Sequence, residues 1–292
     1  MKNHKIVIFG ETGFIGRNLK EYLSQKKDIK LVSVEGLDLL KIKETESFLK
    51  KAKPSVIINL AFIGVNSRAK YSKKYLGDNL KIVENILKAS VGIKELQKII
   101  FLGSSLEYGD SRYPINEKSE LNPKNPYAKV KSATILKSLG FAKKNRLPLM
   151  VLRPFNLYGP YDEKSVIYLL IKSLLENKSI KLTKGEQIRD YLYIKDFAKI
   201  VYDIVRNLGK FENLEIYNVG SSIPVKLSDI FNEVFRHLNK KPKYEIISYR
   251  QNEYMSHVAN TQKIKKIIRL SDLTPLSEGI RATVKWAIGQ SN

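Results

Sequence analysis

The sequence contains no cysteine, so it can form neither a disulfide framework nor a thiolate zinc site. It has only three histidines, His4, His237 and His257, and their spacing does not suit metal ligation. No apolar run is long enough to span a bilayer, and the first residues lack the layout of a signal peptide. We therefore expect a cytoplasmic protein with no metal site and no membrane partner.

Acidic residues are scarce beside basic ones, 29 against 52, which gives a formal net charge of +23 at pH 7. Such a charge is compatible with nucleic-acid binding. The excess is mostly lysine, however, and it is spread along the chain without arginine-rich or aromatic-interleaved blocks. Pairs such as Lys50-Lys51 look like solvated helix faces. We expect no specific nucleic-acid partner, and attraction of anionic small molecules is the milder consequence.

The 292 residues suffice for one large domain or two intimate ones. Apolar runs typical of buried strands alternate with helical patterns up to residue 152. Strands are predicted at 5–9, 30–34, 55–60, 98–103 and 149–152, and helices at about 17–23, 42–52, 76–91 and 126–145. This alternation predicts an α/β fold with a doubly wound parallel sheet. After residue 160, short strands and helices indicate a smaller mixed α/β unit.

A glycine turn follows the first predicted strand directly. Gly10, Gly13 and Gly16 have the spacing G-x-x-G-x-x-G and precede a helix. In this context glycines let the backbone approach a pyrophosphate, whose charge the helix-end N–H groups receive. Glu35 ends the second strand about 20 residues further on, where an acid can hydrogen-bond an adenosine ribose 2′-OH. No arginine adjoins it, which favours NAD over NADP, although Glu35 also fits the pattern of an ordinary exposed loop residue.

Tyr127 and Lys131 are four residues apart and share one face of a predicted helix. Asn125 can cap that helix, and Pro126 suits its first position. An ammonium beside a phenol favours the phenolate, so we expect Lys131 to lower the pKa of Tyr127. Ser104 follows the strand at 98–103, where a hydroxyl faces the ligand crevice of a parallel sheet. An ordinary surface pair is the alternative for Tyr127 and Lys131 in this lysine-rich chain.

Taken in order, these motifs resemble the extended short-chain dehydrogenase/reductase family, in its nucleotide-sugar branch, over nearly the whole length. Asp38-Leu39 looks like the adenine-contacting pair of that family, Asn59-Leu60-Ala61 its fourth-strand motif, and Asn79 its central-helix asparagine. The resemblance implies a Rossmann-type unit at 1–155, to which part of 196–220 returns, and a substrate unit at 156–292. The cofactor-binding residues it implies are Gly10, Gly13, Phe14, Ile15, Gly16, Glu35, Asp38, Leu39, Ala61, Asn79, Tyr127, Lys131 and Pro154.

The second half of the chain resembles the same family. The segments 153–160 (RPFNLYGP), 189–196 (RDYLYIKD) and 250–253 (RQNE) are similar to its substrate-loop, mid-domain and late arginine signatures. A nucleoside-diphosphate sugar is therefore the implied substrate, since the planar fork of arginine suits diphosphate oxygens. The implied substrate-binding residues are Ser104, Ser105, Asn156, Arg189 and Arg250.

The resemblance implies hydride transfer between a nicotinamide cofactor, NAD or alternatively NADP, and a sugar carbon. Tyr127 would relay the proton, Lys131 would lower its pKa and hold the nicotinamide ribose, and Ser104 would orient the sugar oxygen. Dehydratases of the family carry Asp-Glu after the catalytic threonine, where this chain has Ser105 and Leu106. Leucine accepts no proton, so we do not expect dehydration.

Reduction of a C4 ketone, oxidation at C4 and C4 epimerisation remain open. The short connection after the second strand resembles that of the family's ketosugar reductases, so the resemblance favours a ketoreductase or dehydrogenase over a 4-epimerase. A non-catalytic relative that senses dinucleotide or binds RNA is the alternative from a different class. Intact Ser104, Tyr127 and Lys131 argue against it. Because relatives in this family commonly dimerise through the corresponding helices, the resemblance also implies a homodimer formed through the helices at 76–91 and 126–145.

Overall fold

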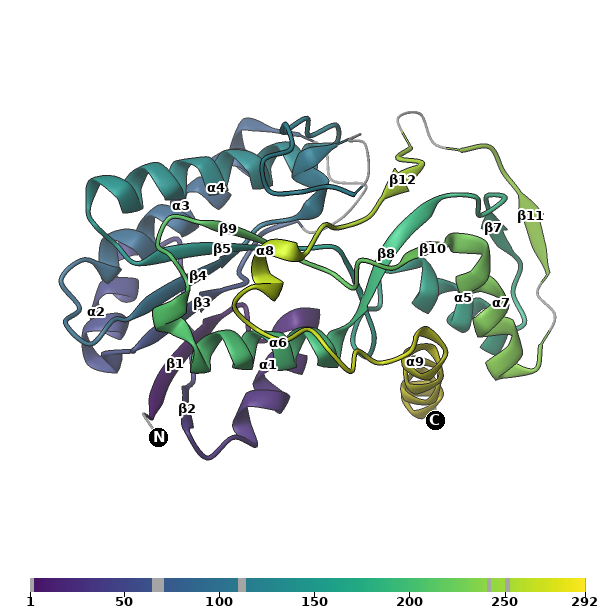
Figure 1. The fold of residues 1–292 in the computed structure, drawn as a ribbon, viewed down its shortest axis with the longest axis horizontal. Helices are drawn as coiled ribbons and strands as arrows, with labels where there is room; N and C mark the ends of the chain where they lie inside the picture. Colours follow the sequence, from purple (N-terminus) through teal and green to yellow (C-terminus); the bar gives the residue numbers. More distant parts are fainter. Residues whose placement is uncertain (1–2, 65–70, 110–113, 241–242, 250–252, 292) are drawn as a thin grey trace.

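The computed structural model describes residues 3–64, 71–109, 114–240, 243–249 and 253–291. Its first half alternates strands and helices (Figure 1). These are β1 (His4–Phe9), α1 (Phe14–Ser24), β2 (Ile29–Val32), α2 (Ile42–Ala52), β3 (Val56–Asn59), α3 (Lys73–Ser90), β4 (Lys98–Leu102), the 3-10 turn η1 (Ser105–Tyr108), α4 (Pro126–Lys144) and β5 (Leu149–Pro154).

The second half consists of shorter elements. These are β6 (Asn156–Tyr158), α5 (Val166–Leu175), β7 (Ile180–Leu182), β8 (Ile188–Tyr193), α6 (Ile194–Arg206), the 3-10 turn η2 (Leu208–Lys210), β9 (Ile216–Val219), β10 (Pro224–Lys226), α7 (Leu227–Leu238), β11 (Tyr244–Ile246), β12 (Ser256–His257), α8 (Gln262–Lys265) and α9 (Leu276–Ser291).

Six parallel strands of the described chain form the large sheet, in the order β2-β1-β3-β4-β5-β9. This arrangement confirms the α/β fold with a doubly wound parallel sheet. Strand β2 lies on one side of β1 and β3 on the other, so the chain reverses its direction of travel between β1 and β3. In open α/β sheets the ligand crevice lies outside the carboxyl ends of the strands at this point. Phe9 and Asn59 are paired there in register.

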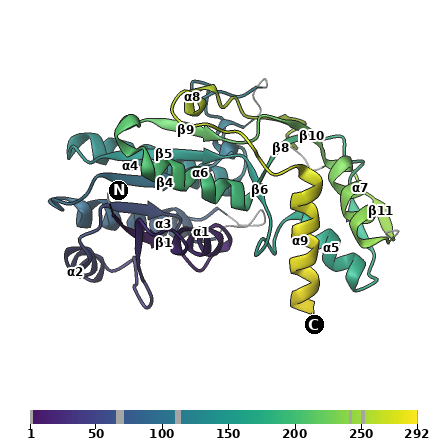
Figure 2. The ribbon, with the colours of Figure 1, turned by 60° about the horizontal axis from the view of Figure 1, so that its bottom comes forward.

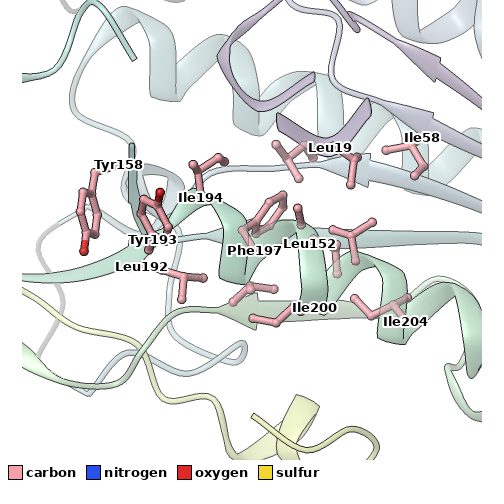
Figure 3. Close-up of a cluster of buried hydrophobic side chains, with 14 of the residues drawn as sticks. Leu19, Ile58, Leu152, Tyr158, Leu192, Tyr193, Ile194, Phe197, Ile200 and Ile204 are labelled. Atoms are coloured by element: carbon pink, nitrogen blue, oxygen red, sulfur yellow. The ribbon is translucent and has the colours of Figure 1, made fainter. Parts of the chain in front are cut away.

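Both faces of the large sheet are covered, as continuous apolar strands require. Because side chains alternate along a strand, Val7 and Phe9 pack with the layer of α2, α3 and α4, whereas Ile6 and Ile8 pack with α1 and α6. The second of these cores continues past the sheet. Figure 3 follows it from Leu19 and Ile58, past Phe197, to Tyr193 and Tyr158 of the smaller part.

The smaller part is built around β8, which pairs with β6 and β12 in parallel and with β10 antiparallel. Strands β7 and β11 form a separate parallel pair, and α5, α7 and α9 pack against one another beside it (Figure 2). Helix α6 packs on α1, and β9 is the edge strand of the large sheet. We therefore propose that the nucleotide-binding unit comprises 1–155 together with 194–219.

Two local predictions differ from the structure. Helix α3 begins at Lys73 rather than near 76, because the Ser72 hydroxyl caps it by accepting a hydrogen bond from the Tyr75 N–H at 3.0 Å. Strands β6, β10 and β12 were not anticipated, since two or three residues are too few to show a period. Within the described ranges, no helix combines the length and apolar character that a bilayer crossing needs.

Candidate active site

The glycine turn lies at the carboxyl ends of β1 and β3, where close backbone contacts require glycine. A Cβ on Gly16 would lie 2.2 Å from the Gly10 carbonyl oxygen, and one on Gly10 would lie 2.8 Å from the Ala61 nitrogen. Gly10 also has φ +83, a conformation that favours glycine. Gly13 precedes α1 with no side-chain cap, so the helix begins with N–H groups that suit an anion. The turn therefore fits a dinucleotide pyrophosphate.

A cavity of about 500 Å³ opens beside this turn. Its lining comprises Phe9, Gly10, Glu11, Thr12, Lys20, Val34, Glu35, Gly36, Leu37 and Leu39. Apolar side chains with a few polar groups, in this size range, are typical of cofactor pockets. The predicted cofactor residues Glu35 and Leu39 thus adjoin the turn. Asp38 is absent from the lining, and its carboxylate instead accepts the Leu40 N–H at 2.9 Å.

Asn79, predicted to contact the cofactor, has its amide engaged by backbone groups in this structure. It is 1% exposed, and its side-chain oxygen accepts the Ile63 N–H at 2.9 Å. Its side-chain nitrogen donates to the Ile63 and Tyr75 carbonyls at 3.2 and 2.9 Å. Asn79 therefore supports the loop that follows β3, and this loop carries Phe62 toward the predicted catalytic pair.

The structure brings Ser104, Tyr127 and Lys131 together at the carboxyl end of β4. Helix α4 begins as predicted, with Pro126 in its first turn and the Asn125 side chain accepting the Ala128 N–H at 2.8 Å. The α4 helix packs against η1, and the Ser104 hydroxyl lies near enough to the Tyr127 phenol to lower its pKa. Ser104 and Lys131 are 8% and 7% exposed, so the polar centre is almost closed to water.

Phe62 covers the other side of this centre. Its ring centroid lies 5.3 Å from that of Tyr127, with the rings nearly perpendicular, and the Lys131 ammonium lies 4.4 Å from the Phe62 centroid. This geometry is a cation–π contact on one side and an edge-to-face contact on the other. Phe62 therefore places an apolar ring against both the phenol and the ammonium.

Burial controls the ionisation of both groups. It raises the pKa of Tyr127 to about 12, opposed by the hydrogen bond from Ser104. It lowers the pKa of Lys131 to about 8, opposed by the charge of Glu107. The expectation that Lys131 lowers the pKa of Tyr127 is wrong for this structure, because desolvation is the dominant effect and the ammonium faces Phe62. At neutral pH the phenol is protonated and the ammonium is charged.

The lowered pKa of Lys131 predicts a pH dependence of stability. Between about 8 and the ordinary value of 10.5, the unfolded chain holds a proton at Lys131 that the folded chain lacks. The cost of burying the charge is therefore present below pH 8 and is lost as the pH rises to 10.5, so this group makes stability rise with pH. The unfolding free energy of the wild type, minus that of Lys131→Met, should increase by roughly 2 kcal/mol between about pH 7.5 and about pH 10. Urea titrations of both proteins at the two pH values measure this difference in unfolding free energy. If the difference were the same at both pH values, the lowered pKa of the buried Lys131 would be contradicted.

A buried ion pair stands directly behind Ser104, and sequence reasoning missed it. Glu107 is 0% exposed, and its carboxylate accepts the Ser104 N–H at 2.7 Å and the Arg153 guanidinium at 2.8 Å. The Arg153 side chain is 1% exposed and also stacks on the Tyr108 ring, 4.6 Å from its centroid. The S-x-x-E spacing of Ser104 and Glu107, a capping-box pattern, was the available signal.

The predicted substrate residues lie on β6, on β8 and in η1. Asn156 on β6 donates to the Asp190 carbonyl at 3.1 Å, which ties it to β8. Arg189 on β8 is paired with Glu253 at 2.8 Å. Ser105 in η1 is 4% exposed, and Pro154 ends β5 opposite Val219. Arg250 lies outside the described residues. Among the described residues, no cluster of three or more acidic or histidine side chains could hold a metal ion.

The parallel sheet, the glycine turn at its switch point and the cavity beside it define a Rossmann-type dinucleotide-binding protein. The sequence profile of the NAD dependent epimerase/dehydratase family matches residues 6–220, and the chain belongs to that family. The resemblance seen in the motifs is confirmed, and the family's cofactor agrees with the expected NAD.

The relatives are enzymes of different reactions. The dTDP-D-glucose 4,6-dehydratase of Dictyostelium discoideum is 30% identical, and the alignment covers 79% of this chain and 61% of that protein. The UDP-glucuronate 4-epimerase of Thermodesulfobacterium geofontis is 27% identical over 86% of this chain and 78% of its own. The structure of UDP-glucuronic acid 4-epimerase from Bacillus cereus, in complex with UDP-glucuronic acid and NAD, shares the fold. It has a TM-score of 0.86 at 22% identity and covers 98% and 99% of the two chains.

Proposed function

We propose that the protein transfers hydride to or from C4 of a nucleoside-diphosphate sugar, most simply as a 4-ketoreductase. The observation that carries this proposal is the centre in which Tyr127 lies one helical turn from Lys131, beside the Ser104 hydroxyl that lowers the pKa of the phenol. The glycine turn, Glu35 and Leu39 would hold the dinucleotide, which supplies or accepts the hydride when bound. Ser104 would orient the sugar oxygen, and Lys131 would hold the ribose beside the nicotinamide.

The protonation state of Tyr127 is compatible with the reductive direction. Reduction of a ketone to an alcohol consumes one proton at the sugar oxygen, and with a pKa of about 12 the phenol carries that proton at neutral pH. Ser104, whose hydroxyl lies beside the phenol, would hold the sugar oxygen that receives this proton. Oxidation in the reverse direction requires the phenolate, which burial disfavours.

Dehydration is disfavoured by the residues after Ser104. Leu106 has no group that could accept a proton from the sugar C5. The next carboxylate, Glu107, is fully buried and already bound to the Ser104 N–H and to Arg153. Neither residue can act as the acid or base of an elimination, which separates this chain from the dehydratase relative.

Arg189 and Asn156 are our candidates for the substrate diphosphate, with Arg250 as a third from the sequence motif alone. Arg189 is held by Glu253 and its side chain is 13% exposed, so it is preorganised and still accessible. The expected homodimer stays a prediction. Helices α3 and α4 pack side by side, and Leu136 on α4 is 56% exposed, an apolar side chain that a second copy could cover.

A nucleotide-sugar 4-epimerase is the second candidate, because the comparisons include two such enzymes. An epimerase oxidises and re-reduces one sugar and so keeps its dinucleotide through turnover. A reductase exchanges its dinucleotide in every cycle. The two candidates therefore differ in the ligand that the purified protein retains.

We expect the purified protein to carry no bound NAD and to convert one NADH per molecule of a 4-keto sugar nucleotide reduced. Mass spectrometry of the ligands retained on the purified protein tests for bound NAD. The fall in NADH absorbance, divided by the amount of sugar nucleotide reduced, measures the NADH converted per molecule. Retained NAD with interconversion of two 4-epimers would establish the epimerase instead. RNA binding with a steep salt dependence, and no turnover of any sugar nucleotide, would contradict both.

A further inference from the structure

An acidic residue occupies the cofactor cavity directly after the first glycine of the turn. Glu11 lines the cavity, and its side chain is 10% exposed. Its backbone passes close to Gly16, where a Cβ would lie 2.6 Å from the Glu11 Cα. A carboxylate beside a site for an anionic dinucleotide is unfavourable unless it serves recognition. Neither the glycine pattern nor the family resemblance requires an acid here.

Glu11 has a cationic partner in the same cavity. The Lys20 ammonium lies 3.2 Å from its carboxylate, and Lys20 is on α1, one turn after Gly16. Among the cavity-lining residues, the charged ones are Glu11, Glu35 and Lys20. This cavity therefore carries a net formal charge of −1 within a chain whose net charge is +23. The cavity is acidic although the molecule is strongly basic.

We propose that Glu11 is a specificity-determining residue, which selects a dinucleotide with a free ribose 2′-OH by neutralising Lys20. Carboxylates accept hydrogen bonds from hydroxyls and repel phosphate, so Glu11 and Glu35 both oppose a 2′-phosphate. Lys20 is the cation that could offset this repulsion, and Glu11 occupies it. The inference rests on the dinucleotide binding of the proposed function and assigns its preference to NAD.

The test is a comparison of NAD and NADP affinities by titration calorimetry, which needs no turnover. The wild type should bind NAD more tightly than NADP. Glu11→Gln frees the Lys20 ammonium and removes one repelling charge, so the ratio of NADP to NAD affinity should rise by at least about tenfold. Adding Lys20→Met to that variant should abolish the gain, because no residue that lines the cavity then carries a positive charge.

Glu21→Gln is the matched control, since Glu21 lies on the same helix but bonds the Tyr161 hydroxyl at 2.7 Å instead of facing the cavity. Its affinity ratio should equal that of the wild type. An unchanged ratio in Glu11→Gln, with NAD still bound, would overturn the role of Glu11 alone. A wild type that prefers NADP would also overturn it and leave the hydride transfer intact. A wild type that binds neither dinucleotide would overturn this inference together with the proposed function.

Discussion

Replacing Tyr127 with phenylalanine should lower turnover at least about a hundredfold, the scale of a lost general acid or base. The substitution removes the phenol oxygen near Ser104 and keeps the ring that packs edge-to-face on Phe62. Dinucleotide affinity and the urea midpoint of unfolding should therefore stay close to those of the wild type. Steady-state rates with a 4-keto sugar nucleotide and NADH measure the effect.

Tyr202→Phe is the matched control for this variant. Tyr202 lies on α6, and its hydroxyl donates to the Asp28 carboxylate at 2.9 Å, so the same atom is removed with the loss of one hydrogen bond. We expect a small loss of stability and unchanged turnover. Near-normal activity of Tyr127→Phe would refute the role of the phenol. Equal losses in both variants would show that a tyrosine hydroxyl matters here only for stability.

The large sheet was predictable because its strands are buried on both faces. Runs such as Ile6–Phe9 and Ile99–Leu102 contain no polar residue. A strand needs such a run only when both of its faces are buried. The strand order follows from the alternation with helices and the glycine turn. The smaller part was predicted less well, since β6, β10 and β12 are held by pairing with β8 rather than by a period of their own.

The predicted site residues differ in whether their surroundings come from neighbours in the sequence or from distant parts of the chain. Asn125 and Pro126 act within four residues, and the sequence alone placed the start of α4 correctly. The pKa of Tyr127 depends on burial by Phe62, which lies 65 positions earlier in the chain, so spacing could not give its direction. Asn79 shows the same limit, because its partners at Ile63 and Tyr75 are set by the tertiary fold.

The ion pair between Glu107 and Arg153 should be the most stability-critical polar contact of the site. Glu107→Ala would leave the guanidinium buried without its anion and the Ser104 N–H without its acceptor. Breaking a buried pair in this way costs about 3–5 kcal/mol. That loss is a large fraction of a typical unfolding free energy of about 5–15 kcal/mol. Urea unfolding followed by circular dichroism measures it.

An exposed ion pair of equal length provides the control. Asp78 and Lys74 are also 2.8 Å apart on α3, but the Lys74 side chain is 83% exposed, so Asp78→Ala should cost at most about 1 kcal/mol. The double variant Glu107→Met with Arg153→Met should recover much of the stability lost in Glu107→Ala, because it removes both charges and keeps apolar volume. Its turnover should nevertheless remain low, since nothing then holds the Ser104 N–H. A double variant with wild-type turnover would show that Glu107 stabilises the fold without positioning Ser104.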